Sequence, residues 1–167
     1  MSEDEKNKLK LIWKNQEDLK VISAYIQDSI VAVKDIVFLR ENRIFIMMVN
    51  RFMWEDGEKE LLKQNKRIRC VIKFEEVLEV KSKKINRENK NKFLECLAIK
   101  YKEISNNNYK IEIFFSGYNI ITLISESIEV FMHDVGKAWN AKHIPKHEIW
   151  MLIYLKILNK TRKKKVD

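Results

Sequence analysis

Apolar residues fill both odd and even positions of residues 43–54, so a strand formed there has two apolar faces. Such a strand must be covered on both sides, which predicts a central strand inside a layered domain. Asn50 and Arg51 interrupt the pattern near its end, just before Phe52 and Trp54. We expect these two polar side chains either to have buried partners or to lie at an exposed functional rim.

The other periodic segments predict two helices and six more strands. Asn15 is a good N-cap, and Leu19, Ile22 and Ile26 repeat at helical spacing, which predicts a helix over 16–29. Alternating apolar positions between turn residues predict strands at 35–40, 67–74, 77–81, 93–103, 109–115 and 119–124. A second helix is predicted after Ser125 or Ser127, with Ile128, Phe131, Met132 and Val135 as its buried stripe and Gly136 as its C-cap.

This order of elements predicts an α+β fold, because no alternation of single strands and helices is present. We expect a mostly antiparallel six- to seven-stranded sheet or partly open barrel, with an N-terminal helix and a C-terminal helix packed on it. Residues 1–147 are predicted to form a single domain. Residues 148–167 are predicted to be an extension that is first apolar and then basic.

The 46% hydrophobic content of the 167 residues is enough for a core without disulfides or metals. Cys70 and Cys96 fall on predicted strands without CxxC spacing, which favours buried thiols in the reducing cytoplasm. The N-terminus lacks the apolar segment of a secretory signal. The apolar run at 149–155 is too short to span a bilayer, so no transmembrane segment is expected.

The residues also resemble a known family. The resemblance depends on Ile22-Ser23-Ala24 with Gln27-Asp28 and on Asn50-Arg51-Phe52 with Trp54-Glu55. It also depends on a second group of motif residues: Gly117 before Ile120, Glu126, Asp134-Val135-Gly136, Ala138-Trp139, Pro145 and His147. Over about residues 9–147 the chain resembles an uncharacterised alphaproteobacterial family that is catalogued as a domain of unknown function. Ile144 stands where that family usually has Arg. The resemblance implies no activity.

The strongest candidate binding residues are Gln27, Asp28, Asn50 and Arg51. An aspartate in the last turn of a helix opposes the helix dipole, so we expect Asp28 to pair with Arg51 and join the first helix to the central strand. The alternative is a polar pocket that binds a carboxylate or phosphate, with Trp54 and His147 nearby. Trp54 and Trp139 are both expected to pack on the core.

Other chemistry receives little support from the sequence, and we expect neither a metal nor a cofactor. His143 and His147 are four residues apart, but Pro145 lies between them. Glu129 and His133 share one face of the second predicted helix, where a solvated pair is the ordinary explanation. Cys96 alternates inward with its neighbours, which predicts an inert thiol rather than a nucleophile. Because no catalytic motif is present, we lean against an enzyme.

The net charge of +9 favours acidic partners, but it is concentrated at the C-terminus, where residues 156–167 carry +5. Arg162, Lys163, Lys164 and Lys165 end this extension and would attract nucleic acid or an anionic membrane surface. A second basic surface is predicted on the strands, made of Arg67, Arg69, Lys73, Lys100, Lys102 and Lys110.

Three functions therefore remain open. The first is a non-enzymatic interaction module of the bacterial cytoplasm, peripheral to the inner membrane if its extension binds lipid. This module would bind a protein partner or a second copy through residues 148–158 or through the Asn50, Arg51 and Trp54 rim. The second is a binder of nucleic acid or anionic membranes through the basic tail. The third is a small-ligand protein or enzyme that uses Gln27, Asp28, Asn50 and Arg51.

Overall fold

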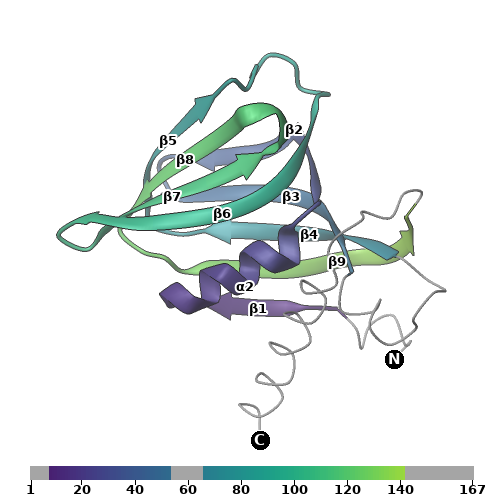
Figure 1. The fold of residues 1–167 in the computed structure, drawn as a ribbon, viewed down its shortest axis with the longest axis horizontal. Coiled ribbons are helices and arrows are strands. Elements are labelled where there is room, and N and C mark those ends of the chain that lie inside the picture. The colour runs from purple at the N-terminus through teal and green to yellow at the C-terminus, as the bar shows by residue number, and fades with distance from the viewer. Residues whose placement is uncertain (1–7, 54–65, 142–167) are drawn as a thin grey trace, which may run out of the picture.

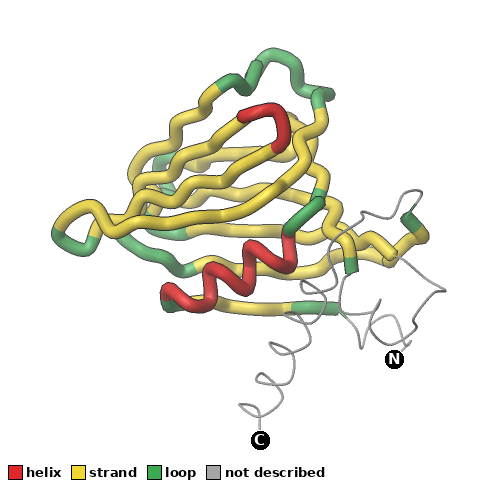
Figure 2. Tube along the Cα trace, in the orientation of Figure 1, coloured by secondary structure: helices red, strands yellow, loops and turns green. Residues whose placement is uncertain are grey.

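A single antiparallel sheet dominates the computed structural model, which describes residues 8–53 and 66–141. Within these residues the sheet has nine strands in the order β1-β9-β4-β3-β2-β6-β7-β8-β5. The strands are β1 (Lys10–Trp13), β2 (Ile30–Leu39), β3 (Ile44–Phe52), β4 (Lys66–Phe74), β5 (Val77–Lys83), β6 (Phe93–Ser105), β7 (Asn108–Phe115), β8 (Asn119–Ser125) and β9 (Val130–Asn140). The described part also has one α-helix, α2 (Gln16–Ile26), and a short 3-10 turn at Ser116–Tyr118 (Figure 2).

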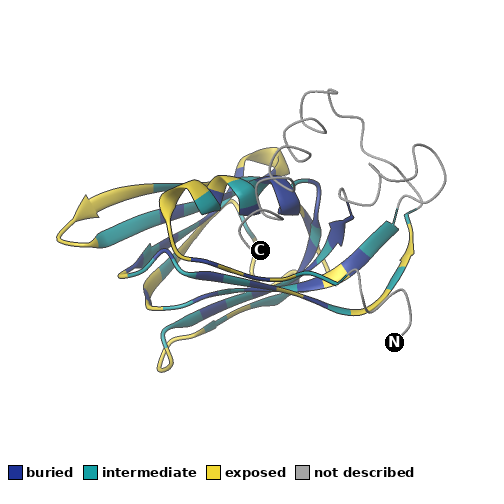
Figure 3. Cartoon of the chain, turned by 90° about the horizontal axis from the view of Figure 1, so that it is seen from below, coloured by how far each residue is buried: buried dark blue, intermediate teal, exposed yellow. Residues whose placement is uncertain are grey.

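The sheet is strongly curved and open, since its edge strands β1 and β5 do not pair with each other. Its concave side holds the main core, and α2 lies over that side (Figures 1 and 3). The mostly antiparallel sheet of the α+β prediction is therefore confirmed. The predicted count of six to seven strands was too low, and the described residues contain no C-terminal helix.

Helix α2 begins where its N-cap predicts. The Asn15 side chain accepts a hydrogen bond from the Asp18 backbone N–H at 3.0 Å. Leu19, Ile22 and Ile26 turn toward the core and are fully buried. The helix ends at Ile26, earlier than predicted, because Asp28 adopts φ +61° and its N–H donates to the Cys96 carbonyl of β6.

Strand β3 is central, as predicted, between β4 and β2. Its inward side chains Phe45, Met47, Val49 and Arg51 are fully buried. The expectation of two covered faces was wrong, because the outward side chains, Ile44, Ile46, Met48 and Asn50, are only half-buried.

The predicted second helix is strand β9. Val130, Met132 and Asp134 point inward and are buried, while His133 between them is exposed, which is the two-residue period of a strand. Asp134 occupies a core position that would normally be apolar, so the alternation is hidden in the sequence. Gly136 does not cap a helix, but its φ of +74° lies where the register between β4 and β9 shifts.

The short strand β1 was not predicted, and β2 begins at Ile30 rather than at residue 35. A register shift in β2 between Val31 and Ile36 accounts for the second difference, because it breaks the alternation there. Trp139 is 40% exposed on β9, so its predicted packing on the core was wrong. Trp54, the histidines of residues 143 and 147, and residues 148–167 lie outside the described residues.

Candidate functional site

The most buried charges of the described chain form one ion pair, between Arg51 of β3 and Asp134 of β9. The guanidinium Nε lies 2.7 Å from Asp134 Oδ1, and Nη2 lies 2.6 Å from Oδ2, so the contact is bidentate. Both side chains are fully buried. Strand β4 separates β3 from β9, with Ile68 opposite Arg51 and Cys70 opposite Asp134, so the arginine reaches across β4.

Additional bonds satisfy the remaining polar atoms of this pair. Asp134 Oδ2 accepts from the Leu9 backbone N–H at 2.9 Å, and the Leu9 carbonyl accepts from the Asp134 N–H. Arg51 Nη1 donates to the Phe52 carbonyl at 3.3 Å, and the guanidinium lies 5.9 Å from the centre of the Tyr25 ring of α2. The pair thus joins β3 and β9 to the residue that precedes β1, beneath α2.

Asp134 is thus a carboxylate that pairs with Arg51, where the sequence predicted Asp28. Arg51 points along the concave face toward β9. Breaking a buried pair by removing one partner typically costs about 3–5 kcal/mol. The pair therefore links β3 to β9 inside the fold.

Asp28 and Asn50 meet at a different arginine, Arg67 of β4. Its Nη1 donates to the Asp28 carbonyl at 3.0 Å and to the Asn50 carbonyl at 3.1 Å, and its guanidinium stacks 5.6 Å from the Phe52 ring centre. Burial lowers the pKa of Arg67, against the opposing effect of the Asp28 and Glu95 carboxylates.

The sequence reading missed this role, because Arg67 alternates outward like Arg69 and Lys73. The structure brings Asp28 and Asn50 together and leaves Gln27 half-buried just after α2. The binding role of these residues, with Trp54 and His147 outside the described part, stays a prediction.

The predicted basic face is divided by the topology. Arg67, Arg69 and Lys73 lie on β4, which β3 and β2 separate from the lysines of β6 and β7. Lys73 also lies over the Phe131 ring, 4.4 Å from its centre, and pairs with Glu75 at 2.9 Å. The strand lysines and arginines do not form a single basic face.

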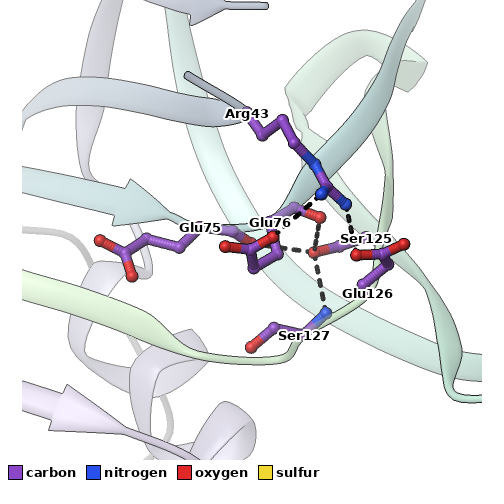
Figure 4. A network of polar contacts seen from close by, with 6 residues as sticks. All are labelled: Arg43, Glu75, Glu76, Ser125, Glu126 and Ser127. Atoms are coloured by element: carbon purple, nitrogen blue, oxygen red, sulfur yellow. Dashed lines mark hydrogen bonds and ion pairs between the residues drawn. The ribbon is translucent and has the colours of Figure 1, made fainter. Parts of the chain in front are cut away.

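A polar network surrounds Arg43 and Ser125 (Figure 4). Arg43, in the turn between β2 and β3, binds Glu76 at 3.3 Å and also Glu126. The Ser125 hydroxyl lies 3.0 Å from the carbonyls of Glu75 and Glu76. These contacts join the turn between β2 and β3 to the turn between β4 and β5 and to the residues just after β8.

Between β2 and β5 the curved sheet has an opening. One edge of β2 pairs with β3, and the other edge pairs with β6 only over residues 30–32. Residues 36–39 therefore have no described strand partner on the edge away from β3. One end of the opening is closed by Lys34, whose N–H donates to the Lys90 carbonyl at 3.0 Å. The other end is closed by Val77, whose N–H donates to the Arg43 carbonyl at 2.8 Å.

This opening contains a cleft of about 220 Å³. We call it the β2–β5 cleft. Its apolar walls come from both sides of the opening and from the core beneath it: Val33, Ile36 and Phe38 of β2, Phe45 of β3, Val80 of β5 and Ile121 of β8. Phe45 and Ile121 belong to the buried core, so the cleft reaches the core.

Three cations line the mouth of the β2–β5 cleft. They are Arg40, which follows β2, and Arg87 and Lys90, from the connection between β5 and β6. All three are exposed, and none forms an ion pair within residues 8–53 and 66–141. Residues 81–92 contain six lysines and arginines against one glutamate, a net charge of +5. The mouth is therefore electropositive.

The two cysteines are buried and free, as predicted. Burial raises the pKa of both thiols, and the nearby Asp134 carboxylate adds to this effect at Cys70. In the described part of the chain no three histidine, cysteine or acidic side chains are grouped as metal ligands. Nor does any described helix have the length and apolar character needed to cross a membrane.

Comparison with known families gives a match over most of the chain. The family described as "Protein of unknown function (DUF2948)" matches residues 9–147. The chain belongs to the DUF2948 family. No curated protein and no solved structure matches it. The match covers the sheet, the Arg51–Asp134 pair and the β2–β5 cleft, so these features lie within the DUF2948 region.

Proposed function

We propose that this DUF2948 chain is a non-enzymatic binding module that takes an anionic partner at the β2–β5 cleft. The observation that carries the proposal is the combination of an apolar cleft with Arg40, Arg87 and Lys90 at its mouth, without partners in the described structure. Exposed cations around a concave site attract anions and hold them by charge-assisted hydrogen bonds.

The polar groups of the fold support binding over catalysis. Arg51 and Asp134 neutralise each other, and Arg67 is bonded to backbone carbonyls. Both thiols are buried with raised pKa values, so neither presents a nucleophilic thiolate.

The test is calorimetric titration of the purified full chain with three anionic probes: octanoate, an eight-residue glutamate peptide and an eight-nucleotide thymidine oligomer. The triple variant Arg40→Gln/Arg87→Gln/Lys90→Gln should weaken binding of at least one probe tenfold or more. The matched control, Lys20→Gln/Lys100→Gln/Lys102→Gln, loses the same charge elsewhere on the exposed surface and should bind as the wild type does. Equal affinities of the triple variant and the control for every probe would refute the proposal.

A second candidate is binding of single-stranded nucleic acid along residues 81–92, which carry a net charge of +5. Its support is the exposed Tyr118 ring with Lys84 Nζ at 5.3 Å from the ring centre, because bases stack on exposed aromatic rings between cations. Affinity should then fall steeply between 50 and 200 mM salt and weaken in Tyr118→Ala. Salt-independent binding would exclude it.

We further propose a bacterial, alphaproteobacterial source and a cytoplasmic location, supported by the family resemblance and by two buried free cysteines. Fractionation of native cells, followed by immunoblotting, tests the location. Recovery from the periplasm would overturn it. The protein-partner and membrane-surface roles of residues 148–167 also stay proposals.

A further inference from the structure

The walls of the β2–β5 cleft restrict the chemistry of its ligand. A fully hydrated ion or a peptide backbone gains nothing from contact with Ile36, Phe38 and Val80, because apolar walls reward the removal of apolar surface from water. The mouth, in contrast, presents two guanidinium groups and one ammonium group. A ligand that uses both parts has an acidic head and an apolar tail.

From this complementarity we propose that the β2–β5 cleft binds a small amphipathic acid. The carboxylate or phosphate head lies among Arg40, Arg87 and Lys90, and the tail lies between β2 and β5 toward Phe45 and Ile121. The inference rests on the proposed function and narrows it to one class of ligand.

The volume of the cleft sets the size of the tail. About 220 Å³ is below the roughly 300–1,000 Å³ typical of sites for drug-sized molecules. A single short alkyl or aryl chain is therefore the expected occupant, and a membrane lipid with two long chains is excluded by size.

The geometry of the opening supports entry from the side. Residues 36–39 of β2 have no strand partner on the side of the cleft, and the opening is closed at both ends by backbone hydrogen bonds. Ile85, in the connection between β5 and β6, is half-buried against the same space. The tail can thus insert between two strands that are already held apart, without breaking the sheet.

The test is a titration series with butanoate, hexanoate and octanoate, each below its micelle concentration, with acetate and octanol as controls. Affinity should rise about two- to fourfold with each methylene that enters the cleft and then level off when the cleft is full. Acetate lacks the tail and octanol lacks the charge, so each should bind at least tenfold more weakly than octanoate.

Two variants separate cleft binding from adsorption to the surface. Ser82 lines the cleft and is exposed, so Ser82→Trp fills the space without disturbing the core. Leu78 of the same strand is exposed, uncharged and does not line the cleft, so Leu78→Trp is the matched control. Octanoate binding should be lost in Ser82→Trp and kept in Leu78→Trp.

Failure of this inference differs from failure of the proposed function. If the peptide or oligonucleotide binds through the three cations while octanoate binds no better than acetate, the ligand class is wrong and the anion site stands. If octanoate binds equally well to both tryptophan variants, the cleft is not its site. If no probe depends on the three cations, both proposals fail.

Discussion

Removal of either member of the Arg51–Asp134 pair should destabilise the fold at least as much as removal of both. Arg51→Met leaves the buried Asp134 carboxylate without the Arg51 cation, and Asp134→Leu takes the Asp134 carboxylate away from the buried Arg51 guanidinium. Each single change should cost about 3–5 kcal/mol. A cost of that size lowers the melting temperature by about 6–20 °C in a chain of this length.

The double variant Arg51→Met/Asp134→Leu removes both charges of the pair. Its main remaining defect is the Leu9 backbone N–H, which loses its acceptor, Asp134 Oδ2. An unsatisfied buried donor costs about 1–3 kcal/mol. The double variant should therefore be at least as stable as either single variant, whereas independent effects would add to about 6–10 kcal/mol.

Urea unfolding followed by tryptophan fluorescence measures these differences, because Trp13 is buried in the core beside Tyr25. The exposed pair of Lys81 and Glu79, 3.4 Å apart, supplies the control. Lys81→Met should change the unfolding free energy by less than about 1 kcal/mol. If the two single costs at Arg51 and Asp134 add up in the double variant to within about 0.5 kcal/mol, the two groups do not form the pair described here.

Three further predictions concern local features of the fold. Burial raises the pKa of Cys70 and Cys96 above the ordinary 9.0, so the native protein should resist thiol reagents at pH 8 and react with them after urea is added. The unfolding free energy should also fall by about 1 kcal/mol per cysteine between pH 9 and 10, because the thiols ionise in the unfolded chain first. Cys→Ala variants should lose this pH dependence. Gly136→Ala should lower the unfolding free energy by about 1 kcal/mol, because the φ of residue 136 is +74°. The added Cβ meets no atom within 4 Å, so the cost comes from the backbone alone. A decrease above about 3 kcal/mol would contradict this cause. Asn15→Ala should cost about 1 kcal/mol through the lost N-cap, and Asn15→Asp should restore most of that stability in thermal unfolding.

Local patterns were sufficient for most of the sheet. β4, β6, β7 and β8 lie within about two residues of their predicted bounds, because each alternates apolar and polar residues between turn residues. The turn between β6 and β7 contains Asn106 and Asn107, which both have positive φ, a conformation that asparagine tolerates better than most residues.

The predictions fail where contacts between residues distant in the sequence, and not the local pattern of apolar and polar residues, decide the structure. β9 was read as a helix because an inward position holds Asp134 instead of an apolar residue, and that aspartate is stable there only because Arg51 arrives from another strand. The four residues of β1 carry too short a pattern to recognise. The β2–β5 cleft had no local signal, since Arg40, Arg87 and Lys90 look like ordinary surface cations until the topology brings them together.

The positive charges of this chain therefore have two roles that sequence alone does not separate. Arg51 faces the core, where leaving it unpaired is costly, so its carboxylate partner comes from within the fold. Arg40 and Arg87 are solvated at a concave mouth, where a cation costs little without a partner and remains available to an external anion. Burial, more than residue type, decides which arginines stabilise this fold and which are available for binding.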